Sequence, residues 1–101
     1  MTDNVEKKDI INKKDTGFMY VAAKSNVQAV ASSILKAVDS GSPVIIRAIG
    51  AGAVNQAIKA LAAASGPLAT KGYIALVKPG FAETSINEES RTVITLRLVL
   101  Q

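Results

Sequence analysis

The sequence predicts an α/β two-layer sandwich with the element order β-α-β-α-β-β and one mixed four-stranded sheet. Two apolar, β-branched segments, residues 18–23 and 44–49, are each followed by a stretch with apolar residues at helical spacing. Two more strand-like segments, residues 73–77 and 91–100, follow with no helix between them. Right-handed crossovers place both helices on one face of such a sheet and leave the other face open. We expect the strand order 1-2-4-3.

Composition narrows the class of protein. The chain has 101 residues, which is the size of one domain, and with 4% aromatic residues its core is built from Val, Ile, Leu and Ala. It has no Cys and no His, so the commonest general base and the commonest metal ligands are missing. We therefore expect no catalytic residues, no metal and no cofactor, and a protein that is not an enzyme.

Charge and hydropathy separate an N-terminal arm from a basic body. Residues 1–17 hold four lysines and four acidic residues, so the net charge of +4 belongs to residues 18–101. We expect a flexible charged arm over residues 1–17 and one domain over residues 18–101. No apolar run approaches the roughly 20 residues of a membrane span, and no signal peptide is evident, which favours a cytoplasmic location. The basic body suggests an anionic partner.

The first helix has clear sequence signals at both ends. Ser25, with Gln28 three residues later, fits a capping box. Apolar residues between positions 27 and 38 form one stripe, and Gly41 ends the helix.

The second helix and the third strand are bounded by glycine and proline. The helix is predicted from about residue 53 to residue 64 and is ended by Gly66–Pro67. Pro79–Gly80 makes the far end of the third strand irregular or places it at a sheet edge. A polar loop is predicted over residues 82–90.

Three arginines are expected on the open face of the sheet. Arg91 and Arg97 share the same alternation in the last strand. Arg47 interrupts an apolar strand, and a buried face cannot easily hold a lone guanidinium. The three side chains either contact phosphates or pair with acids across a subunit interface.

A strand, a glycine turn and a helix form one connected unit in the middle of the chain. Gly50, Ala51 and Gly52 follow the second strand and place free backbone N–H groups at a helix N-terminus. A dinucleotide fingerprint would need a third glycine where Asn55 stands. The turn either serves only to bend the chain or binds an anion, with Asn55 and Gln56 nearby.

Three stretches resemble the stage V sporulation protein S family, a small bacterial family with an Alba-like fold. They are Ala22-Ala23-Lys24-Ser25, the run of residues 48–60 and the acidic entry to the last strand at residues 88–94. The resemblance covers residues 18–99. It implies the fold of Alba chromatin proteins, which bind DNA and RNA as dimers, and a regulatory role in sporulation or a related developmental process.

On this resemblance we expect a nucleic-acid-binding protein of low sequence specificity, for DNA or RNA, that forms a homodimer or tetramer and has no membrane partner. Self-association would cover the apolar part of the open face and the alanine-rich second helix. The acidic residues near the last turn depart from the Alba pattern, because they repel phosphates. The alternative is a non-enzymatic structural or protein-interaction module that acts through self-assembly. The residues expected at the nucleic acid are Lys24, Ser25, Arg47, Asn55, Lys59 and Arg91.

Overall fold

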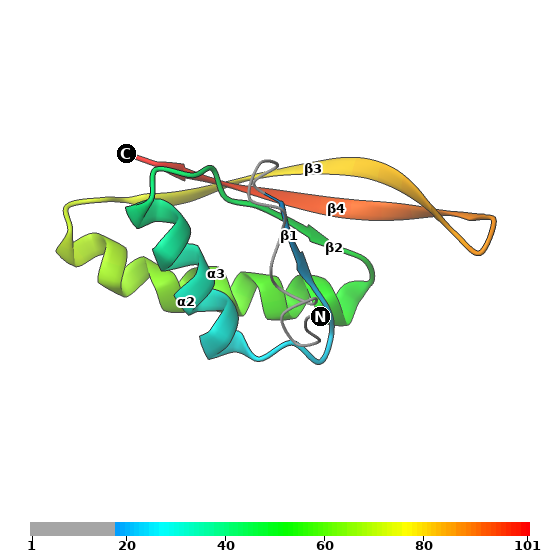
Figure 1. Cartoon of the computed structure of the whole chain (residues 1–101), viewed down its shortest axis with the longest axis horizontal. Helices are drawn as coiled ribbons and strands as arrows, with labels where there is room; N and C mark the ends of the chain where they lie inside the picture. The colour runs from blue at the N-terminus through cyan, green and yellow to red at the C-terminus, as the bar shows by residue number, and fades with distance from the viewer. Residues whose placement is uncertain (1–17) are drawn as a thin grey trace.

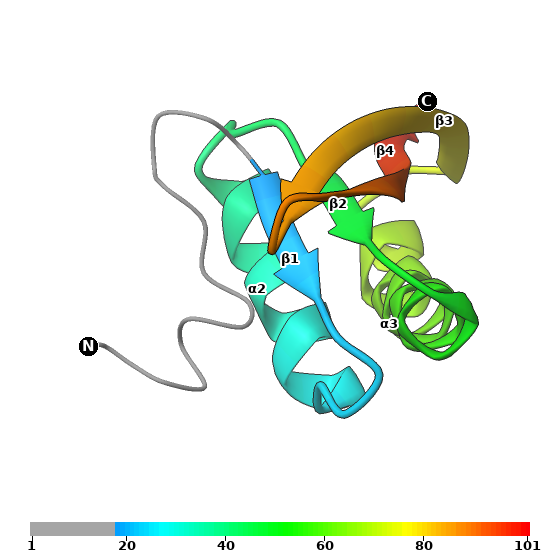
Figure 2. The ribbon, with the colours of Figure 1, turned by 90° about the vertical axis from the view of Figure 1, so that its right-hand side faces the viewer.

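A computed structural model describes residues 18–101, which form a four-stranded sheet with two helices packed on one of its faces (Figure 1 and Figure 2). The predicted flexible arm, residues 1–17, lies outside the described residues. The elements are β1 (Phe18–Val21), α2 (Val27–Asp39), β2 (Ile45–Ala48), α3 (Ala51–Thr70), β3 (Ala75–Ile86) and β4 (Glu89–Leu100). The predicted fold class and element order are confirmed.

The sheet has the strand order β1-β2-β4-β3, as the sequence predicts. The pair β1 and β2 is parallel, because α2 carries the chain back between them, and the other two pairs are antiparallel. The sheet is therefore mixed, and β3 forms one of its edges.

The core lies between the sheet and the helices. Ile46 of β2 and Ile34 of α2 are fully buried, and so is Leu68 of α3. Small residues on α3 let its backbone approach the sheet and α2 closely. The core cluster consists of Met19, Val21, Val30, Ala31, Ile34, Val44, Ile46, Ala57, Ala60, Leu61, Ala64, Leu68 and Leu96.

Helix α2 begins one residue later than a cap at Ser25 would require. The N-cap is Asn26, whose side-chain oxygen accepts a hydrogen bond from the Ala29 N–H at 2.9 Å. The Ser25 hydroxyl instead accepts from the Ala22 N–H at 2.9 Å and closes the turn after β1. The predicted capping box is therefore wrong. The predicted end is correct, because Gly41 has a positive φ of 75° directly after the last turn.

Helix α3 continues through Gly66–Pro67, so the prediction that this pair ends it is wrong. Pro67 removes one backbone donor, but Leu68 beside it is buried in the core, and its packing keeps the last turn in place. The helix ends at Thr70, and Gly72, just after the C-cap residue Lys71, has a φ of 92°. There the Tyr73 N–H bonds the Leu68 carbonyl at 3.0 Å in a Schellman arrangement.

Strand β3 likewise passes through Pro79–Gly80 without a break. The expected irregular end is wrong, while the expected edge position is confirmed, and an edge strand can accept proline. A Cβ atom at residue 80 would lie 2.9 Å from the Thr95 hydroxyl oxygen, so glycine is needed for the close approach of β3 to β4 here.

The predicted polar loop over residues 82–90 is in fact the distal part of a long β-hairpin. Strands β3 and β4 pair from Ala75 opposite Leu100 to Ile86 opposite Glu89. Strand β2 pairs with β4 only as far as Ile94, so residues 82–93 project beyond the rest of the sheet (Figure 1). We call residues 82–93 the hairpin arm.

The tip of the arm contains a conformational strain that mutation can relieve. Asn87 and Glu88 have φ angles of 52° and 67°, as in a type I′ turn. Asparagine tolerates this conformation, whereas glutamate does so poorly. Replacing Glu88 by glycine should therefore raise the free energy of unfolding by about 1 kcal/mol. Urea denaturation measures the change.

The matched control is Asn87→Gly, for which we expect a smaller increase because Asn already occupies this region at low cost. A lower stability of Glu88→Gly than of the wild-type protein would contradict the two-residue turn.

Candidate nucleic-acid interface

One face of the sheet carries no helix in the described part of the chain (Figure 1). Alternation along the strands decides which side chains lie there. Met19, Ile46 and Leu96 pack against the helices, so their neighbours along each strand point away from the helices. We call this side the open face. Its register positions include Phe18, Tyr20, Ile45, Arg47, Leu76, Lys78, Thr95, Arg97 and Val99.

Three cations from three different strands are neighbours on the open face, and we call Arg47, Lys78 and Arg97 the basic cluster. Lys78 lies directly opposite Arg97, and Arg47 lies opposite Thr95, two residues before Arg97. Like charges in directly opposed positions are destabilising. Among the described residues, the acidic residue that shares the alternation of the open face and lies nearest in the strands is Glu89, at the tip of the arm. The cluster is thus positive with no acidic side chain set among its members.

Arg47 is the best-defined member of the basic cluster. Its guanidinium carbon lies 5.0 Å from the centroid of the Phe18 ring and 5.8 Å from that of Tyr20. These distances suit cation–π attraction, which offsets part of the cost of placing the charge beside rings. The Nε atom is buried and bonds to no atom of residues 18–101. This buried and unpaired donor costs stability.

A pocket of about 440 Å³ adjoins Arg47. Its lining residues come from the ends of β1 and β2, from the residues that follow these strands and from the hairpin arm, so segments far apart in the sequence form its walls. Val93 is only 3% exposed although it lies outside the core cluster, which shows how closely the arm covers this place. The lining residues are Tyr20, Val21, Ala22, Ala23, Arg47, Ile49, Thr84, Ile86 and Val93.

The loop after β1 is fixed to the start of α3. The Gln56 side-chain nitrogen donates to the Ser25 carbonyl at 2.9 Å. A Cβ atom at Gly52 would lie 3.0 Å from the Cβ of Ala23, so glycine allows this close approach. Lys24 is exposed on the loop and is held in place by these two contacts.

Backbone conformation explains why glycine stands at the turn between β2 and α3. Gly50 is the N-cap of α3 with a φ of 93°, a conformation that glycine adopts without strain. Its carbonyl accepts from the Val54 N–H at 3.1 Å, and no side chain caps the helix. A role in the tight turn is enough to explain why Gly50, Ala51 and Gly52 stand here. Anion binding at this turn stays a prediction.

The structure divides the predicted nucleic-acid residues into three groups. Lys24, Ser25, Asn55 and Lys59 belong to the loop after β1 and to α3, where Lys24, Asn55 and Lys59 are exposed and Ser25 is buried. Arg47 lies on the open face, while Arg91 belongs to the hairpin arm.

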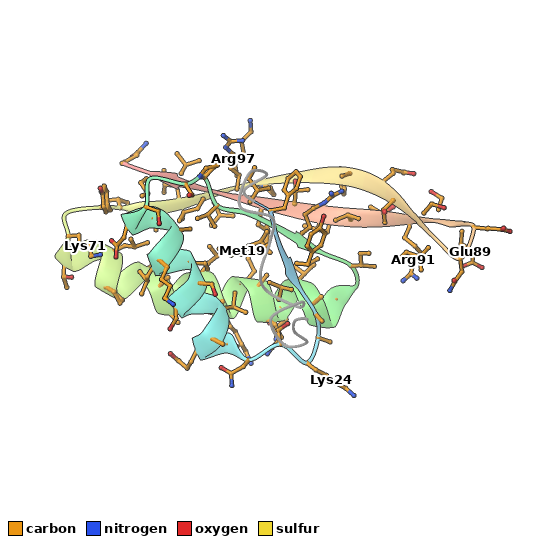
Figure 3. All side chains as sticks on the ribbon, viewed as in Figure 1. Met19, Lys24, Lys71, Glu89, Arg91 and Arg97 are labelled. Carbon is orange, nitrogen blue, oxygen red and sulfur yellow. The ribbon has the colours of Figure 1, made fainter. Side chains whose placement is uncertain are left out.

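The twist of the hairpin separates two arginines of the same strand. Arg97 and Arg91 share the alternation of β4, as predicted. Figure 3 nevertheless shows Arg97 pointing away from the helices and Arg91 pointing toward the side on which the helices lie. A two-stranded ribbon twists strongly, so side chains of one alternation turn to different sides along it. The expectation that all three arginines share the open face therefore holds for Arg47 and Arg97 and is wrong for Arg91.

Sequence reasoning missed Lys78 and the pocket. Lys78 lies two residues after Leu76 and shares its side of the strand, as alternation indicates. The expected irregular end at Pro79–Gly80 left Lys78 outside the predicted strand. The pocket depends on the curvature of the arm, for which the sequence offers no comparable signal.

Two further findings concern residues 18–101. No group of three or more His, Cys, Asp or Glu side chains within this range could hold a metal ion. Neither α2 nor α3 combines the length and the apolar character needed to cross a membrane.

A family comparison agrees with the fold and the resemblance. The family model described as stage V sporulation protein S (SpoVS) matches residues 17–101, which include all six elements of the structure. This chain therefore belongs to the stage V sporulation protein S family, a family of sporulation proteins.

Proposed function

We propose that this protein is a non-enzymatic regulator of sporulation or a related developmental process, and that it binds DNA or RNA with little sequence preference. The observation that carries the proposal is the basic cluster on the open face. Lys78 and Arg97 stand directly opposite each other, an arrangement that costs stability in the free protein. A polyanion that contacts both side chains removes this repulsion, and successive phosphates suit a row of separate cations.

The wider charge distribution supports the same partner. Outside the hairpin arm, residues 18–101 contain seven Lys and Arg residues and a single acidic residue, Asp39. The Asp39 carboxylate pairs with Lys71 at 2.6 Å on the helical side. The open face is thus left with its positive charge, which would attract an anionic strand over a distance of about one Debye length, ~8 Å at physiological salt.

The hairpin arm has the projecting shape of a groove-binding arm but the opposite charge. It carries Glu83, Glu88 and Glu89 against one cation, Arg91. Glu83 also accepts a hydrogen bond from the Ser90 hydroxyl at 2.8 Å, which holds this carboxylate on the arm. We infer that phosphates contact the basic cluster and avoid the tip of the arm.

A specific observation also favours self-assembly as the second candidate function. Phe81 is 80% exposed and Ile74 is 62% exposed, both beside the free edge of β3. Exposed apolar residues at an unpaired strand edge suit a second copy of this chain, because burial yields about 25 cal/mol per Å² and the edge can extend the sheet. This surface differs from the open face and the alanine-rich helix that the sequence suggested. A homodimer through β3 would be compatible with nucleic-acid binding.

The first test of nucleic-acid binding removes two members of the basic cluster. The double variant Lys78→Ala/Arg97→Ala should weaken binding to duplex DNA of any sequence. If each side chain neutralises one phosphate, the log–log salt slope should fall in magnitude by about 1.8. Fluorescence polarisation over a series of salt concentrations measures it.

The control is Lys36→Ala/Lys71→Ala, which removes the same charge from the helical side of the protein and should change the salt slope little. Equal losses in both variants would show that only net charge matters. If the wild-type protein binds neither DNA nor RNA at low salt, self-assembly becomes the favoured function.

A second prediction concerns the arm. Glu88→Gln/Glu89→Gln removes two negative charges and should strengthen binding to all sequences alike, since these carboxylates repel phosphates. The same titration measures the affinity, and the increase should shrink at high salt. Weaker binding by this variant would mean that the carboxylates contact the nucleic acid or a bridging cation.

A third prediction concerns the edge of β3. The wild-type protein should be dimeric at high micromolar concentration, and Phe81→Ser should shift it toward the monomer in light scattering. Val99→Ser, on the open face, is the control and should leave the mass unchanged. Dissociation by Val99→Ser alone would place the interface on the open face, and a monomeric wild-type protein would reject self-assembly.

A further inference from the structure

The pocket beside Arg47 combines three features that bear on what it could bind. Its walls are mainly apolar side chains, such as Ile49, Ile86 and Val93. It contains one aromatic ring, Tyr20, which is 48% exposed, and one cation, Arg47. Its volume of about 440 Å³ lies within the range of small-molecule pockets, roughly 300–1,000 Å³. A flat, apolar ligand that also carries negative charge matches all three features.

Arg47 is prepared for such a ligand. The rings of Phe18 and Tyr20 hold its guanidinium group within 5.8 Å of their centroids, so little side-chain freedom remains to be lost on binding. Its buried Nε lacks a hydrogen-bond partner in the described protein, and an unpaired buried donor is costly. An acceptor on the ligand would remove that cost only after a small shift of the side chain, because the atom has almost no exposed surface.

The basic cluster continues from the pocket across the sheet. Arg97 lies one diagonal step from Arg47, and Lys78 lies opposite Arg97. A ligand whose flat part occupies the pocket would therefore have cations beside it for one or more phosphate groups.

We propose that this pocket binds the base of a nucleotide, with Tyr20 stacking on the base and Arg47 contacting the base edge or its phosphate. The nucleotide is either an unpaired residue of a DNA or RNA strand or a free nucleotide. Binding of an unpaired residue of a nucleic-acid strand rests on the proposed function. It adds that the protein prefers single-stranded nucleic acid to a duplex. Paired bases in a duplex are stacked on one another and cannot enter the pocket.

The proposal also gives the hairpin arm a role that fits its composition. Ile86 and Val93, near the two ends of the arm, form one wall of the pocket. The acidic residues of the arm do not appear in this wall. The arm would thus contact a base through apolar atoms while its carboxylates stay away from the phosphates.

The test uses the full chain and four probes at one salt concentration. The probes are a ten-nucleotide single strand with one central 2-aminopurine, the same strand with an abasic site in its place, the corresponding duplex, and 2-aminopurine riboside 5′-monophosphate. Polarisation of a terminal dye reports strand binding, and 2-aminopurine fluorescence reports stacking. We expect quenching with the first probe and an affinity about tenfold above that of the abasic strand or the duplex, the effect of one base stack.

The diagnostic variant is Tyr20→Leu, which keeps an apolar side chain but removes the ring. It should abolish the quenching and the tenfold preference while leaving the salt slope unchanged, because no phosphate contact is lost. The control is Tyr73→Leu, a tyrosine of similar exposure away from this pocket, which should behave as the wild-type protein. Circular dichroism melts of both variants verify folding.

Failure of this inference is distinguishable from failure of the proposed function. If strands bind with a steep salt slope but the abasic strand binds equally well, the pocket proposal is overturned and nucleic-acid binding stands. If only the free monophosphate is quenched, and Tyr20→Leu abolishes this, the pocket binds a free nucleotide and the polymer-binding function falls. If no probe binds, both are overturned.

Discussion

The alternation of side chains along β2 is the constraint on which the rest of the structure depends. Ile46 and Ala48 are almost completely buried against the helices. Arg47, between them, must therefore point to the open face, because successive side chains of a strand take opposite sides. A slip of one residue would bury a guanidinium group and expose the core. The same register that forms the core thus also presents the cation beside the pocket.

Two residues near the start of α3 fix the position of the ends of β1 and β2, and these strand ends line the pocket. Gly52 and Gln56 hold the start of α3 against the loop after β1, so the ends of β1 and β2 are fixed beside that helix. The pairing of β2 with β4 ends at Ile94, and beyond this point β4 pairs with β3 alone to form the hairpin arm. The pocket forms where these fixed strand ends meet the arm. Its shape therefore depends on contacts in the helical layer as well as on the sheet.

Predictions from the sequence are correct for elements that the periodicity of apolar residues determines. They are wrong where glycine and proline predict an end but packing continues the helix or strand. The apolar stripes predict both helices, although not the end of the second, and the cost of burying a guanidinium group predicts the side of Arg47. The predicted strand order is also confirmed. Glycine and proline at residues 66–67 and 79–80 predict ends of a helix and a strand. Burial of Leu68 and pairing with β4 instead carry the helix and the strand through these positions. The second error hid the hairpin arm and Lys78. The pocket could not be predicted at all, because it arises from the bend and twist of the arm.

Under the proposed function, the separation of charge along the hairpin would restrict how a strand of nucleic acid lies on this protein. Its acidic residues belong to the projecting arm, whereas Lys78 and Arg97 occupy the part that pairs within the sheet. Phosphates of such a strand would be attracted at one end of the hairpin and repelled at the other, over a length greater than the Debye length of about 8 Å at physiological salt. A strand that follows the hairpin would meet the repulsive tip. A strand that crosses the sheet from β3 toward β1 meets Lys78, Arg97 and Arg47 in turn and arrives at the pocket.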